Sequence, residues 1–117
     1  MKQSRKINYI ELPCRDMAAT KAFFSQVFGW GFIDYGPEYM AFENAGIDGG
    51  YYQSEQRALT KDGSALVVLY SAELEKTLSA VKDAGGQILQ DIFNFPGGRR
   101  FHFTDPSGNE YAVWSDV

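Results

Sequence analysis

The hydrophobic pattern near the start of the chain has the two-residue period of a strand. In residues 7–12, Ile10 and Leu12 alternate with Tyr9 and Glu11, so the two pairs face opposite sides. The pattern therefore predicts a strand that holds Tyr9 and Glu11 together on one face.

The period then changes to that of a helix. Residues 17–28 carry a broad apolar face at helical spacing, with Asp16 placed to cap the start and Gly29 to end it. Pro13, which has no N–H to donate, is expected to end the preceding strand. Three short strand-like runs separated by turn residues follow at 31–35, 39–43 and 48–53.

The same order of elements is repeated in the second half. Residues 64–70 predict a buried strand, Ser71 a helix cap, and 74–81 a helix that ends before Gly85. Three further strands are expected at 87–93, 99–104 and 110–114. The chain thus predicts one domain over residues 1–117, with modules at about 6–53 and 64–117 and a polar linker at about 54–63.

This element order, with the segments ELPCRDM (11–17), AFFSQVFGW (22–30) and FTDPSGN (103–109), resembles the vicinal oxygen chelate superfamily. That superfamily holds glyoxalase I, bleomycin-resistance and extradiol dioxygenase proteins. The resemblance implies an α+β fold in which two βαβββ modules form a curved sheet around a central cleft, with the helices outside. It also implies a homodimer, as in many members.

The enzymes of this superfamily bind a divalent metal through four strand positions, which are occupied here by residues that make a poor ligand set. They are Tyr9, Ala65, Ala112 and, for the fourth, Gly50 or Tyr51. A catalytic metal needs about three His, Asp or Glu donors, so we predict no metal and no cofactor. A shifted strand register would bring Glu11, His102 and Glu110 together instead.

Composition narrows the class of partner. The net charge of −4 lacks the basic surface that nucleic acids require. No apolar run approaches the ~20 residues of a membrane helix, and the single cysteine, Cys14, fits a reducing compartment. We therefore expect a cytoplasmic protein without nucleic-acid or membrane partners. The aromatic share of 15% predicts a dense core or an aromatic cleft.

The candidate cleft residues are those that alternation and the family resemblance place on the inner strand faces. They are Tyr9, Glu11, Tyr51, Val67, Leu69, Arg100, His102 and Trp114. Glu11 has a structural interpretation, as an ion pair with Arg99 or Arg100 or as part of a solvent-exposed strand face. It also has a functional interpretation, as a ligand anchor or general base. His102 is the other candidate for acid–base catalysis, because histidine titrates near neutral pH.

The leading functional hypothesis is a glyoxalase-like protein that lacks the family's metal ligands and binds or sequesters a small organic ligand, aromatic or otherwise flat. Tyr9, Glu11, Tyr51, Arg100, His102 and Trp114 would line its site. One alternative is a lyase or isomerase, either metal-dependent through the shifted set or metal-free through Glu11 and His102. Another alternative is an interaction module whose cleft is filled by its own side chains.

Overall fold

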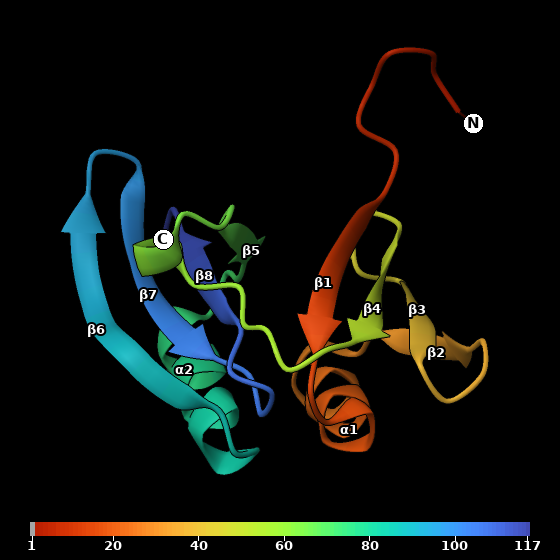
Figure 1. Cartoon of the computed structure of the whole chain (residues 1–117). Coiled ribbons are helices and arrows are strands. Elements are labelled where there is room, and N and C mark those ends of the chain that lie inside the picture. The colour runs from red at the N-terminus through yellow and green to blue at the C-terminus, as the bar shows by residue number, and fades with distance from the viewer. Residues whose placement is uncertain (1) are drawn as a thin grey trace.

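Each half of the chain forms one strand, one helix and three further strands (Figure 1). The structure, a computed structural model, describes residues 2–117. The first half consists of β1 (Ile10–Cys14), α1 (Met17–Phe28), β2 (Gly31–Asp34), β3 (Tyr39–Glu43) and β4 (Gly49–Gln53). The second half, which follows a 3-10 turn at Thr60–Asp62, consists of β5 (Val67–Tyr70), α2 (Leu74–Asp83), β6 (Gln87–Phe95), β7 (Gly98–Thr104) and β8 (Glu110–Ser115).

The two halves build two separate four-stranded sheets of the same topology. The strand orders are β1-β4-β3-β2 and β5-β8-β7-β6, and the first strand of each half runs parallel to the last. The helices α1 and α2 contact each other and lie on the same side of the sheets (Figure 1). These are the two βαβββ modules of an α+β fold, as predicted.

The helix boundaries follow from local chemistry. The Asp16 side chain accepts a hydrogen bond from the Ala19 N–H at 3.0 Å, and Gly29 ends α1 with a left-handed φ of 73°. The expected cap of α2 needs correction: Glu73 is the cap residue, and Ser71, two residues earlier, accepts a hydrogen bond through Oγ from the Glu73 N–H at 3.0 Å. None of the helices within residues 2–117 is long and apolar enough to cross a membrane.

Pro13 was predicted to end β1. Instead it lies inside this strand, opposite Tyr52. Because β1 is the edge strand of its sheet, one side of it has no ladder to interrupt. Proline is tolerated at such edges.

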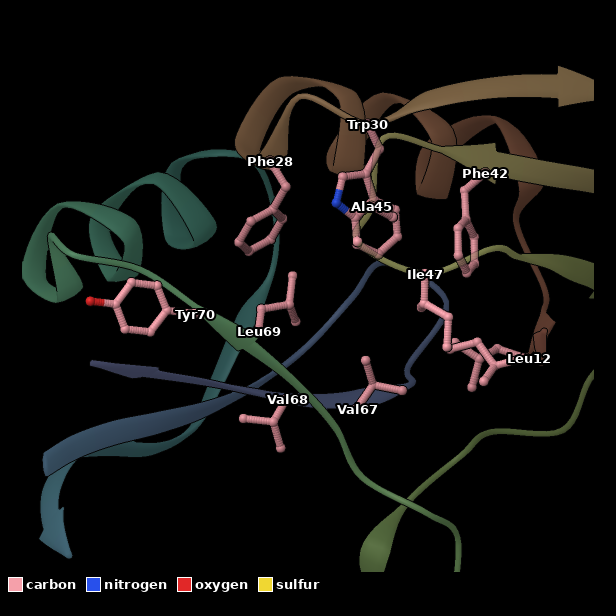
Figure 2. A pocket seen from close by; sticks show the side chains of 12 residues that line it. Leu12, Phe28, Trp30, Phe42, Ala45, Ile47, Val67, Val68, Leu69 and Tyr70 are labelled. Atoms are coloured by element: carbon pink, nitrogen blue, oxygen red, sulfur yellow. The ribbon is translucent and has the colours of Figure 1, made fainter. Parts of the chain in front are cut away.

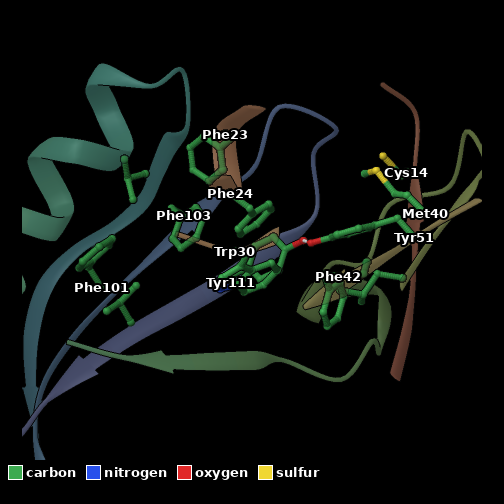
Figure 3. Packing of buried hydrophobic residues seen from close by; sticks show 14 of the residues in the cluster. Cys14, Phe23, Phe24, Trp30, Met40, Phe42, Tyr51, Phe101, Phe103 and Tyr111 are labelled. Atoms are coloured by element: carbon green, nitrogen blue, oxygen red, sulfur yellow. Dashed lines mark hydrogen bonds between the residues drawn. The ribbon is translucent and has the colours of Figure 1, made fainter. Parts of the chain in front are cut away.

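One aromatic core joins the two modules (Figure 3). Phe24 of α1 stacks on Trp30 with ring centroids 4.5 Å apart and meets Tyr111 of β8 edge to face at 5.1 Å. Tyr51 of β4 reaches the same Tyr111, and their hydroxyl groups lie 2.8 Å apart. The core is thus continuous from the first sheet through α1 to the second sheet.

The turn at 105–109 organises the polar side of this core. Asp105 Oδ1 accepts from the N–H groups of Ser107 at 2.9 Å and Asn109 at 3.0 Å, and its Oδ2 accepts from the Tyr111 hydroxyl at 2.7 Å. Burial raises the pKa of Asp105, although these hydrogen bonds oppose the shift. Burial also raises the pKa of the Tyr51 and Tyr111 hydroxyls well above the ordinary value, so both stay protonated.

The same turn binds the second module to the first. Ser107 Oγ accepts from the Asp16 N–H at 3.0 Å and lies 2.7 Å from the Thr20 hydroxyl. Asn109 donates through Nδ2 to the Pro13 carbonyl at 2.6 Å. The DPSGN segment therefore serves to hold the modules together.

Candidate functional site

Each sheet has one face against the helices and one face without a helix. On β7 and β8, Phe101, Phe103, Tyr111 and Val113 belong to the core, so alternation turns the intervening side chains to the helix-free face. With their register partners, these side chains form the helix-free face of the second sheet. Its members are Val68 and Tyr70 of β5, Phe93 and Phe95 of β6, Arg100, His102 and Thr104 of β7, and Glu110, Ala112 and Trp114 of β8.

A hydrogen-bonded pair of buried titratable side chains lies at one end of this face. His102 Nδ1 is 2.9 Å from Glu110 Oε2, and the two residues are only 6% and 9% exposed. Glu110 Oε1 accepts from both the N–H and the hydroxyl of Thr60, each at 2.9 Å. Burial by itself raises the pKa of Glu110, but the hydrogen bonds from His102 and Thr60 outweigh it, and the pKa is lowered.

The ionised Glu110 fixes the state of the imidazole. A carboxylate only accepts hydrogen bonds, so Nδ1 carries the proton and donates it to Oε2. In the neutral ring, Nε2 is then a hydrogen-bond acceptor. This atom is buried and has no hydrogen-bond partner in the part of the chain that the structure describes.

Arg100 occupies the next position along this face of β7. Its guanidinium lies 5.3 Å from the ring centroid of Phe93 and 5.6 Å from that of Phe95. The Arg100 Nε–H is also buried, and within residues 2–117 it finds no hydrogen-bond acceptor. A shallow pocket of about 340 Å³ opens beside it, lined by Val68, Phe95, Gly97, Arg100 and Trp114.

Tyr9 and Glu11 lie on the first sheet in a separate polar cluster. The Tyr9 and Tyr39 hydroxyls are 2.6 Å apart, and Tyr39 donates to Glu11 Oε2 at 3.0 Å. The Tyr39 ring lies over Gly50, where a Cβ atom would stand 2.3 Å from its hydroxyl oxygen. Burial and these two hydrogen bonds raise the pKa of Tyr39.

This cluster excludes the expected ion pair of Glu11. Neither Arg99 nor Arg100 is its partner: Arg99 forms a bidentate ion pair with Glu75 of α2. Glu11 is instead an exposed carboxylate held by a tyrosine. The structure therefore does not pair Glu11 with His102, whose carboxylate partner is Glu110.

The expected positions of Tyr51, Val67 and Leu69 need correction. Tyr51 is fully buried and points into the core, because Gly50, not Tyr51, lies opposite Glu11 in the register. Val67 and Leu69 also pack against the core, which leaves their neighbours Val68 and Tyr70 on the helix-free face, 45% and 51% exposed. Both errors come from stretches whose apolar residues do not alternate.

All four residues of β5 line a different cavity, which lies between the two modules. It has a volume of about 430 Å³ and is walled by Ile10 and Leu12 of β1 and by Trp30, Phe42 and Leu69. In Figure 2, Leu69 and Val67 point toward these aromatic rings, while Val68 points away from them. The cavity offers apolar contact but no charged side chain.

The residues at the positions where the resemblance implies metal ligands do not fit a divalent cation. Ala65 and Ala112 have no donor atom, and Tyr9 is bonded to Tyr39. No three His, Cys, Asp or Glu side chains gather anywhere among residues 2–117. Of the shifted set, only His102 and Glu110 contact each other.

Sequence reasoning missed Phe93, Phe95 and Thr60 as parts of this region. Alternation gives no phase for Phe93, because the β6–β7 pairing is irregular between Gln90 and Phe93. Thr60 belongs to the linker, where no periodic pattern exists. Glu110 carried a usable signal, since it shares the strand phase of Trp114.

Known proteins share both the sequence pattern and the fold. Residues 6–113 match the model of the Glyoxalase/Bleomycin resistance protein/Dioxygenase superfamily. The Mycobacterium bovis protein "Putative glyoxylase CFP32" is 24% identical over 92% of this chain, which spans only 44% of that protein.

Two solved structures extend this comparison. A glyoxalase-related enzyme from Fulvimarina pelagi has a TM-score of 0.79 at 20% identity, over 95% of this chain and 88% of the other. The fosfomycin resistance protein FosX from Listeria monocytogenes has a TM-score of 0.78 at 18% identity, over 98% and 96%. The match to the superfamily model covers nearly the whole chain, and the chain therefore belongs to the Glyoxalase/Bleomycin resistance protein/Dioxygenase superfamily.

Proposed function

We propose that this chain binds a small aromatic anion on the helix-free face of the second sheet, without a metal ion. The observation that carries the proposal is Arg100, a cation whose Nε–H is buried without an acceptor at the edge of a pocket. A buried donor without a partner is costly, and a bound carboxylate would satisfy it.

The walls of the pocket favour a flat ligand. Trp114 and Phe95 supply aromatic surface, with ring centroids 6.2 Å apart, and Val68 adds an aliphatic wall. Small-molecule sites commonly combine such apolar walls with few orienting polar groups. Here Arg100 is the charged group among the residues that line the pocket.

The relatives agree with a role in small-molecule binding. FosX is named for resistance to fosfomycin, and CFP32 is named as a glyoxylase. We propose sequestration rather than turnover as the primary activity, because the metal positions hold alanines. The cytoplasmic location and the absence of nucleic-acid partners remain part of this proposal, on the net charge of −4 and the single buried thiol of Cys14.

We also propose a homodimer. Val68 and Tyr70 stay half exposed beside the pocket, and β1 and β5 each have one edge without a strand partner. A second copy of the chain that covered this face would bury apolar surface and close the site. Analytical ultracentrifugation is expected to give a dimer mass, and a monomer at micromolar concentration would contradict it.

Calorimetric titration with phenylacetate tests the binding site. We expect saturable binding that weakens about tenfold or more in Arg100→Gln, the loss typical of a charge-assisted hydrogen bond. Arg99→Gln is the matched control, because Arg99 is the next residue but pairs with Glu75 on α2. Absence of binding, or equal weakening by both substitutions, would refute the proposed site.

A further inference from the structure

Two buried polar atoms lack hydrogen-bond partners among the described side chains, and they are neighbours. Arg100 Nε and His102 Nε2 belong to residues two apart on β7, so both side chains leave the same face. Two residues along a strand span ~7 Å, the scale of a small organic acid. One atom is a donor and the other an acceptor, so together they require a ligand that offers both an acceptor and a donor.

The contacts of Glu110 determine which nitrogen of His102 is left for a ligand. Thr60 supplies two hydrogen bonds to Glu110 Oε1, which leaves Oε2 to receive the Nδ1–H. Carboxylates commonly fix the tautomer of a histidine whose other nitrogen meets a ligand. The nitrogen left without a partner is therefore Nε2, which is a hydrogen-bond acceptor in the neutral ring.

A single side chain lies beside both unpartnered groups. The Phe93 ring is 5.3 Å from the Arg100 guanidinium and 5.8 Å from the His102 ring. Phe93 directly follows the irregular stretch of the β6–β7 pairing, where the ladder constrains the strand less. A rotation of this ring would therefore change the surroundings of both the Arg100 guanidinium and the His102 imidazole.

We propose that the ligand is an aromatic hydroxy acid: its carboxylate accepts from Arg100 Nε–H and its hydroxyl donates to His102 Nε2 once Phe93 has rotated. This proposal rests on the proposed function and deepens it by naming the ligand class. The aromatic ring of the acid lies in the pocket beside Trp114. Glu110 and Thr60 act as positioning residues, because they hold His102 and do not touch the ligand.

The test compares two probes that differ by one hydroxyl group, mandelate (each enantiomer separately) and phenylacetate. We expect the better mandelate enantiomer to bind about fivefold more tightly, the effect of one additional hydrogen bond. His102→Asn keeps a donor for Glu110 but has no group at the Nε2 position, so the two acids should bind equally. His102→Gln, which places an amide near the Nε2 position, should restore part of the difference.

The single histidine gives a readout that needs no variant. In ¹⁵N spectra of the untagged protein, the Nε2 resonance should shift on addition of mandelate and stay unchanged with phenylacetate.

Phe93→Ala should tighten binding of both acids, because no ring has to be displaced; weaker binding would overturn the role of Phe93. Equal affinities with an unmoved Nε2 signal would overturn the ligand class and leave the arginine site standing. Failure of both acids to bind would overturn the site as well.

Discussion

Glu110 is a buried carboxylate whose charge is stabilised by the fold. Its pKa is lowered by hydrogen bonds from His102 and Thr60 that outweigh the opposing effect of burial. A carboxyl group with a lowered folded pKa contributes stability above its unfolded value, here 4.5, and loses that contribution as the pH falls through the folded pKa. The free energy of unfolding should therefore decline as the pH falls below about 4.5.

Glu110→Gln should flatten this acid dependence. Urea unfolding between pH 3 and pH 7 would measure it, with Glu43→Gln, an exposed carboxylate at the end of β3, as control. The raised pKa of Asp105 changes the free energy of unfolding in the opposite direction as the pH falls. Because Asp105 is present in every variant, the difference in pH dependence between the wild type and Glu110→Gln isolates the contribution of Glu110. An unchanged slope in Glu110→Gln would contradict the hydrogen-bonded pair.

At the scale of single residues, alternation is a good guide only where it is regular. On β7 and β8 it places Arg100, His102 and Trp114 on one face, and the register confirms that they share it. On β4 the paired glycines hide the phase, and Tyr51 was assigned to the wrong face. The strand phase places Glu110 on the face of His102, but the hydrogen bond between them also depends on the β7–β8 register, which local sequence does not specify.

At the scale of elements, the turn at 105–109 should contribute to stability more than a surface turn does. Ser107→Ala removes the acceptor of the Asp16 N–H and the partner of the buried Thr20 hydroxyl. Leaving such buried groups unsatisfied costs about 1–3 kcal/mol. Urea denaturation should show this loss, whereas Ser64→Ala, whose hydroxyl donates only to the adjacent Ala65 carbonyl, should change little. A neutral Ser107→Ala would show that the turn does not hold the modules.

The order of the elements was predictable because the hydrophobic period changes where a strand gives way to a helix, and because turn residues separate the consecutive strands. The details that depend on neighbouring strands were not. Pro13 remains inside β1 because that strand is an edge, and edge position is a property of the sheet. The irregular pairing before Phe93, which places a ring over the candidate site, is set by the fit of β6 to β7 and has no local sequence signature.

At the scale of the whole molecule, the continuous core predicts that both modules unfold together. Phe24 and Tyr51 connect α1 and the first sheet to Tyr111 of the second sheet. Each module carries one tryptophan: Trp30 lies in the core beside Phe24, and Trp114 lies on the helix-free face. Single-tryptophan variants, Trp114→Phe and Trp30→Phe, therefore report on one module each.

In each variant the fluorescence transition in urea should coincide with the transition in far-UV circular dichroism, as expected for one cooperative unit. Tyr51→Phe removes a hydroxyl that bridges the modules, so it should lower stability by about 1 kcal/mol in both backgrounds. Fluorescence and dichroism midpoints that separate, or a Tyr51→Phe effect seen by Trp30 alone, would mean that the modules unfold independently. In that case the Tyr51–Tyr111 contact would join two bodies that are each stable by themselves, and the candidate site on the second sheet would survive loss of the first.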